Sequence, residues 1–110
     1  MGDKEFFKSL DESGVVRLRF RISTTKGKVR CFVVQLESLI DGEWKTVVRY
    51  DNAHGFVHRD VMDAKGREKG KDILLLDVGS SIAFAEQDLV DRWEWYVDSF
   101  VKSVKTRVRK

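Results

Sequence analysis

Apolar and polar residues alternate along residues 15–50, and this period of two is typical of strands with one buried face. Two short segments that end in glycine, at residues 25–27 and 40–42, interrupt the alternation and favour hairpin loops. The pattern therefore predicts three consecutive antiparallel strands. Their apolar positions share one face, which consists of Val16, Leu18, Phe20, Ile22, Phe32, Val34, Leu36, Trp44, Val48 and Tyr50.

The lengths of the two loops set which residues of neighbouring strands face each other. Three-residue loops would place Phe20 opposite Phe32 and Val34 near Val48. A slip of one residue would mix the apolar and polar sets. The assignment of residues to faces is therefore a stronger prediction than the pairing itself.

Two more apolar segments, at residues 56–62 and 71–78, predict further strands. The second contains the run Ile73-Leu74-Leu75-Leu76, and such a continuous apolar run is typical of a strand buried on both faces. The charged residues 66–71 between them are flanked by glycine and predict a loop.

The two ends of the chain predict helices of very different length. Phe6, Phe7 and Leu10 have the spacing of a short helix within residues 1–14, and an irregular tail is the alternative. Over residues 80–106, apolar residues recur every three or four positions, a serine is available as the N-cap, and acids precede bases as the helix dipole favours. The apolar stripe consists of Leu89, Val90, Trp93, Tyr96, Val97, Phe100, Val101 and Val104.

Together these elements predict a single α+β domain over residues 1–110. Residues 1–14 form a tail or short helix, residues 15–78 an antiparallel β-meander of four to five strands, and residues 80–106 one long C-terminal helix packed on one face. The helix must bury its apolar stripe, and the apolar face of the sheet is the available partner.

Composition narrows the class of protein without indicating a function. The net charge of +3 is too small to indicate a nucleic-acid binder by itself. The single cysteine, Cys31, excludes an intramolecular disulfide and a cysteine-rich zinc site, and we expect it to be buried. No apolar run reaches the roughly 18 residues of a membrane span, and no hydrophobic signal region is present, so we expect a cytoplasmic protein without membrane association.

Residues 49–60 gather both histidines of the chain and several charged residues at the end of a predicted strand. Histidine titrates near neutrality and can transfer a proton, a neighbouring aspartate can orient it, and arginine binds phosphate. The candidate catalytic residues are His54, His58 and Asp51, and the candidate phosphate ligands beside them are Arg49 and Arg59.

Metal binding is a weaker interpretation of the same segment. Its possible metal ligands are Asp51, His54, His58 and Asp60. The two histidines are four residues apart, which on an extended strand is about 13 Å and too far for one ion unless the loop folds back. We therefore expect no metal and no other cofactor. A purely structural interpretation is the alternative, in which Asp51-Asn52 forms an Asx turn at the strand end and the histidines lie on the surface.

Arginines follow one face of the first predicted strand. Arg17, Arg19 and Arg21 point the same way about 6.5–7 Å apart, a spacing comparable to that of phosphates along an extended single strand of RNA. No row of aromatic residues interleaves with them, as a stacking platform would require. The alternatives are a solvated sheet face and a docking face for an acidic partner.

Trp95 is a candidate contact with another chain. It follows Trp93 by two residues, so it points away from the apolar stripe of the predicted helix. The alternative is that the Phe6-Phe7 segment covers it.

The run Arg49-Tyr50-Asp51-Asn52-Ala53-His54, followed by His58, resembles the TumE family of toxins from toxin–antitoxin pairs. The resemblance implies an RNA-directed module with a cognate antitoxin, and it points to the same site residues. The chain departs from the family pattern where Gly55-Phe56-Val57 replaces part of a loop that is richer in histidine and proline in the family.

Two hypotheses follow for the function. The first is an RNA-directed, toxin–antitoxin-type module with metal-independent, ribonuclease-like chemistry, in which the arginine face holds the substrate. The second is a non-catalytic interaction protein that forms a homodimer or binds an acidic partner through the arginine face or Trp95.

Overall fold

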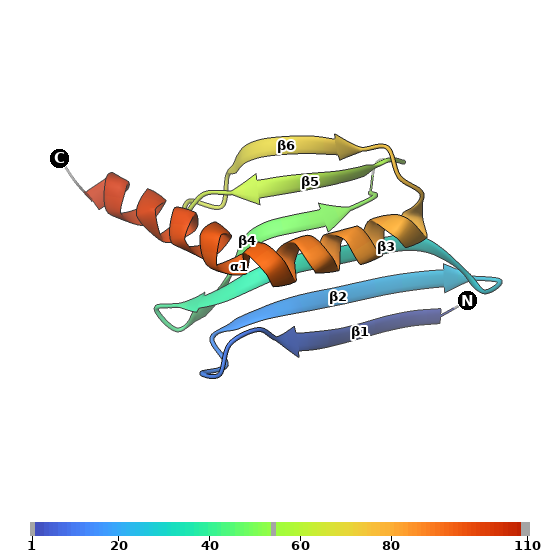
Figure 1. Cartoon of the computed structure of the whole chain (residues 1–110), viewed down its shortest axis with the longest axis horizontal. Coiled ribbons are helices and arrows are strands. Elements are labelled where there is room, and N and C mark those ends of the chain that lie inside the picture. The colour runs from blue at the N-terminus through green and yellow to red at the C-terminus, as the bar shows by residue number, and fades with distance from the viewer. Residues whose placement is uncertain (1, 54, 109–110) are drawn as a thin grey trace.

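The computed structural model describes residues 2–53 and 55–108, which form a six-stranded antiparallel sheet and one helix (Figure 1). The strands follow one another across the sheet in sequence order, and α1 crosses one face. This arrangement confirms the predicted α+β meander with a C-terminal helix. The elements are β1 (Gly2–Ser9), β2 (Val16–Thr25), β3 (Lys28–Ile40), β4 (Glu43–Asp51), β5 (Val57–Met62), β6 (Glu68–Leu74) and α1 (Val78–Val108).

The sheet has more strands than predicted because residues 2–9 form β1, not a tail or a short helix. Phe6 and Phe7 are adjacent, so in a strand they point to opposite faces. Phe6 stacks on Phe20, with ring centroids 4.6 Å apart, and Phe7 lies against the guanidinium of Arg17 on the other face. Pairing with β2 therefore decides the conformation of this segment.

The hairpins β2–β3 and β3–β4 have two-residue loops, one residue shorter than predicted. Lys26 and Gly27 have φ angles of 55° and 77°, and Asp41 and Gly42 have 54° and 80°. Positive φ at both central residues is typical of the type I′ turn, whose twist matches that of the paired strands.

In each hairpin the shorter loop shifts the register by one position and a bulge, at Ser23/Thr24 or at Leu36/Glu37, shifts it by one more. Phe20 pairs with Val34, where we predicted Phe32, and Val34 pairs with Tyr50, where we predicted Val48. The predicted pairs were wrong, but each of these residues lies on its predicted face because the shift is an even number of positions.

A bulge in β4 moves one predicted core residue to the other face. The register between β3 and β4 shifts after Leu36, which pairs with Val48, and Val47 is the extra residue. Trp44 therefore lies on the face of the sheet that α1 does not cover. There the guanidinium carbon of Arg17 lies 3.8 Å from the centroid of the Trp44 ring. The prediction for Trp44 was wrong because one inserted residue inverts the alternation beyond it.

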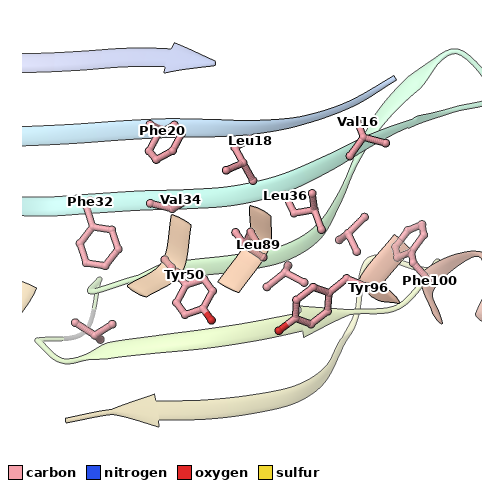
Figure 2. Close-up of a cluster of buried hydrophobic side chains, with 14 residues drawn as sticks. Val16, Leu18, Phe20, Phe32, Val34, Leu36, Tyr50, Leu89, Tyr96 and Phe100 are labelled. Atoms are coloured by element: carbon pink, nitrogen blue, oxygen red, sulfur yellow. The ribbon is translucent and has the colours of Figure 1, made fainter. Parts of the chain in front are cut away.

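α1 packs across β3, β4 and β5 and buries its apolar stripe against the predicted face of the sheet (Figure 2). Tyr50, Leu89, Tyr96 and Phe100 are buried in this interface. Among the described residues, no helix is long and apolar enough to cross a membrane.

Asp77 caps the helix, where we predicted a serine. Its Oδ1 accepts a hydrogen bond from the backbone N–H of Ser80 at 2.8 Å. A side-chain acceptor three positions before that N–H is the usual N-cap arrangement.

β6 is an exposed edge strand, where we predicted a strand buried on both faces. Its first half is formed by residues 68–71, which we predicted to be a loop. Ile73, Leu75 and Leu76 are exposed, Leu75 to 95%. Cys31 is exposed as well, contrary to prediction.

Candidate functional site

We refer to the face of the sheet opposite α1 as the open face. Cross-strand pairing arranges its residues in rows that run from β1 to β6. One row consists of Phe7, Arg19, Gln35, Arg49, Asp60 and Lys71. The next consists of Glu5, Arg21, Val33, Asp51, His58 and Ile73. The predicted site residues of β2, Arg49, Asp51 and His58 are therefore all on one face.

The arginines of β2 meet acids from neighbouring strands. Arg17 Nε donates to Glu37 Oε1 at 2.7 Å, and Arg19 Nη2 lies 2.7 Å from Glu5 Oε2. Arg21 is exposed. Because β2 itself contains no acid, its sequence suggested a more positive face than pairing with β1 and β3 creates.

Aromatic side chains also lie on the open face. The guanidinium carbon of Arg17 lies 4.3 Å from the ring centroid of Phe7 and 3.8 Å from that of Trp44. Phe7 is 49% and Trp44 36% exposed. The sequence showed no aromatic row beside the arginines because these two residues belong to β1 and β4.

A hollow of about 490 Å³ lies on the open face, where β2 and β4 end and β3 begins. Arg21 and Arg49 contribute its positive charge, while Ser23, Asp51 and Asn52 contribute further polar groups. Arg49 is about half exposed, and its Nε donates to Gln35 Oε1 at 3.3 Å. The hollow therefore offers two arginines on an accessible surface.

Next to this hollow, Asp51, His58 and Asp60 form a compact cluster. His58 Nε2 lies 3.0 Å from Asp51 Oδ1 and 3.6 Å from Asp60 Oδ2. One ligand atom from each of the three residues lies within 4.8 Å of the others. Asp51 and His58 are buried, and His58 is only 3% exposed. Strand pairing places Asp51 directly opposite His58.

Asp51 also makes the Asx turn that the structural interpretation predicted. Its Oδ1 accepts a hydrogen bond from the backbone N–H of Ala53 at 3.1 Å. Asn52 continues the β3–β4 ladder with its side chain: its Oδ1 accepts from Phe32 N–H and its Nδ2 donates to the Arg30 carbonyl, both at 3.0 Å. The Asp-Asn pair therefore has a structural role whatever the function.

Arg59, one of the predicted site residues, does not join the cluster. His54 lies outside the described residues. Arg59 points to the helix face, where its Nη1 donates to the Tyr96 hydroxyl at 3.0 Å and its Nε to Asp72 Oδ2 at 3.1 Å. Since adjacent residues of a strand point to opposite faces, Arg59 and His58 cannot act together on one ligand.

The sequence analysis missed a polar network between α1 and the sheet. The hydroxyls of Tyr50 and Tyr96 converge (Figure 2) and both donate to Asp88 Oδ2, at 2.6 Å and 2.7 Å. Burial and the bond to Asp88 raise the pKa of Tyr50 and raise the pKa of Tyr96 to about 12. The sequence did hold a sign of this network, because one tyrosine lies on the predicted apolar face of the sheet and another in the apolar stripe of the predicted helix.

Trp95 is 58% exposed, as expected for a contact residue. Its ring lies 5.3 Å from that of Tyr96, and the Arg92 guanidinium carbon is 4.8 Å from its centroid. The alternative was that the Phe6-Phe7 segment covers Trp95. Phe6 instead stacks on Phe20 in the sheet, and Trp95 remains exposed.

Fold and site define an α+β domain with a charged, open sheet face and a buried His–Asp cluster. The chain belongs to the family described as Domain of unknown function (DUF7718), which it matches over residues 1–106. No curated protein and no solved structure matches the chain significantly.

Proposed function

We propose that this protein binds single-stranded RNA on the open face. The observation that carries the proposal is the accessible hollow between Arg21 and Arg49. Arg21 is the last of the three arginines along β2. Guanidinium groups bind phosphate oxygens in pairs of hydrogen bonds. A hollow of about 490 Å³ is within the usual size of a small-ligand site.

The aromatic residues support a single strand as the ligand. Sequence-tolerant proteins that bind single strands combine a basic groove with exposed rings on which bases stack. Phe7 and Trp44 offer such rings on either side of Arg17. The resemblance of residues 49–58 to the TumE toxins also agrees with RNA as the target and with an acidic antitoxin that competes for this face.

The proposal is limited to binding. A general acid or base must reach the proton that it transfers. His58 is 3% exposed, and its Nε2 lies 3.0 Å from Asp51 Oδ1. The cluster therefore suits a structural role beside the hollow, which Asp51 lines, better than the cleavage of RNA.

Fluorescence anisotropy with a short, labelled single-stranded RNA tests the proposal. We expect the Arg21→Ala/Arg49→Ala variant to bind at least about tenfold more weakly and to lower the slope of log affinity against log salt by about 1.4, since each contact with a single strand contributes about 0.7. The matched control is Arg67→Ala/Lys102→Ala, which removes the same charge at exposed positions outside the hollow. Equal losses in both variants, or binding that does not depend on salt, would contradict the proposal.

We also propose a homodimer as a second candidate function. Phe56, Ile73, Leu75 and Leu76 form an exposed apolar group at the end of β5 and β6, and β6 is an edge strand that a second copy could pair with. Light scattering over a range of concentrations should give a dimer mass for the wild type and a monomer mass for Leu75→Ser. The Trp95→Ala variant tests the other exposed contact. A monomer mass in every sample would remove this candidate.

A further inference from the structure

We propose that Asp51, His58 and Asp60 bind a divalent transition-metal ion such as Zn²⁺ or Mn²⁺. The inference goes beyond RNA binding and does not depend on it. It also reverses our expectation from the sequence, in which the distance between His54 and His58 argued against a metal shared by Asp51, His54, His58 and Asp60. The cluster instead draws its ligands from β4 and β5.

Two of the three separations between donor atoms already match those that such an ion requires. Zinc binds histidine nitrogen and carboxylate oxygen at about 2.0–2.2 Å, which for tetrahedral or octahedral geometry sets neighbouring donors about 3–3.6 Å apart. His58 Nε2 lies 3.0 Å from Asp51 Oδ1 and 3.6 Å from Asp60 Oδ2. The widest of the three separations is at most 4.8 Å, which a small rotation of a carboxylate closes.

The strands hold these ligands in place. Asp51 pairs directly with His58, and Asp60 is two positions further along β5, so all three project from the same face. Residues directly opposite one another on paired strands have Cβ atoms about 4.5–5.5 Å apart. Binding therefore requires side-chain adjustment and little movement of the backbone.

The neighbouring cations contact the carboxylate oxygens that face away from His58. Arg49 Nε lies 3.8 Å from Asp51 Oδ2, and Lys71 Nζ lies 3.5 Å from Asp60 Oδ1. The other oxygen of each carboxylate is directed at His58 Nε2. Outer contacts orient ligating carboxylates, and these two leave the oxygens nearest His58 available to a metal ion.

The set of donors selects the class of ion. Imidazole favours Zn²⁺ and its neighbours in the first transition row, while two carboxylates also suit Mn²⁺. Three protein ligands leave coordination positions for water or for an oxygen of a bound anion. Asp51 lines the hollow, so an ion at this site would be next to the proposed phosphate position.

Titration calorimetry of metal-free protein with Zn²⁺ alone, and electron paramagnetic resonance with Mn²⁺ alone, test this site. We expect one equivalent of metal per chain. Affinity should fall by at least about 100-fold in Asp60→Asn and in His58→Ala, because loss of a direct ligand costs more than the roughly 10- to 100-fold typical of an outer-shell partner. Asp60→Asn is close in shape to the wild type and keeps the test valid if His58→Ala does not fold. The matched control is Asp3→Asn, an exposed position on the edge strand β1, which should bind like the wild type.

Three outcomes would overturn the site. The wild type binds neither ion; Asp60→Asn binds as tightly as the wild type; or His54→Ala abolishes binding while Asp60→Asn preserves it. The Arg21→Ala variant separates this inference from the proposed function, since it should weaken RNA binding and leave Zn²⁺ binding unchanged.

Discussion

Asp88 is the polar centre of the interface between α1 and the sheet. The hydroxyls of Tyr50 and Tyr96 both donate to its Oδ2, and the Nη1 atoms of Arg59 and Arg92 each lie 3.7 Å from one of its oxygens. A buried carboxylate is costly unless hydrogen bonds satisfy it. The hydrogen bonds from the two tyrosines therefore offset the cost of placing the Asp88 carboxylate in an otherwise apolar layer.

We expect Tyr50→Phe and Tyr96→Phe each to lower the free energy of unfolding by about 1–2 kcal/mol. The double variant should lose more than the sum, by about 0.5–1 kcal/mol, because either hydroxyl alone still satisfies Asp88. Urea unfolding of the four proteins measures the coupling. Tyr50→Phe combined with Lys28→Ala, an exposed residue at a hairpin end, should be additive. Strict additivity of the two tyrosine changes would show that they do not share Asp88.

The candidate site was only partly predictable at the scale of residues. Arg49, Asp51 and His58 were candidates from the sequence, and all lie on the open face. Asp60 was considered only as a possible metal ligand, although alternation along β5 already places it on the same face as His58. What the sequence did not show is that pairing of β4 with β5 brings Asp51 to them. Arg59 was wrongly grouped with His58, although alternation along a strand already separates adjacent residues.

At the scale of elements, the start of α1 depends on the polar residues that precede it. Asp77 accepts the Ser80 N–H at 2.8 Å and the Ser80 hydroxyl at 3.1 Å. These bonds from Ser80 hold the pKa of Asp77 below its usual value. The ionised carboxylate therefore stabilises the folded state more than it stabilises the unfolded chain.

We expect Asp77→Ala to lower the melting temperature by a few degrees at neutral pH. Because the folded pKa of Asp77 is lowered, its contribution is present above the unfolded value of about 4 and is lost as the pH falls through the folded value. The difference between wild type and variant should therefore shrink below about pH 4. Calorimetry at several pH values measures it, with Asp98→Ala in the exposed middle of α1 as the control. A difference that stays constant into acid would contradict a charged cap.

Elements differed in how far local pattern could predict them. The faces of β2 and β3 followed from alternation, and α1 followed from its apolar stripe. β1 did not, and the apolar run predicted β6 only in part, with a later start and a burial that it lacks. An edge strand is stabilised by pairing along one side and needs no strong pattern of its own. The bulge at Val47 is a property of the β3–β4 pair. The adjacent apolar pair Val47-Val48 interrupts the alternation of β4, but it does not by itself show that the register changes there.

At the scale of the whole molecule, each strand pairs with its neighbours in sequence. The chain contains no proline and only one cysteine. The usual causes of very slow folding steps, proline isomerisation and disulfide rearrangement, are therefore absent from this sequence.

We accordingly expect refolding from urea to lack a phase of tens of seconds. Stopped-flow tryptophan fluorescence measures it. Double-jump experiments provide the control, since the amplitude and rate should not depend on how long the chain was kept unfolded. A slow phase that grows with the time spent unfolded would contradict the prediction, whereas one that grows with protein concentration would report assembly.

By itself, the sequence determined the α+β class, the side of the sheet on which most strand residues lie, and the apolar stripe of the helix. These follow from side-chain alternation and helical spacing, which are local properties of the chain. The tertiary structure decided the register, the bulge that turns Trp44 outward, the acids beside the arginines and the meeting of Asp51, His58 and Asp60. Each of these depends on contacts between strands, and such contacts leave no local periodicity in the sequence.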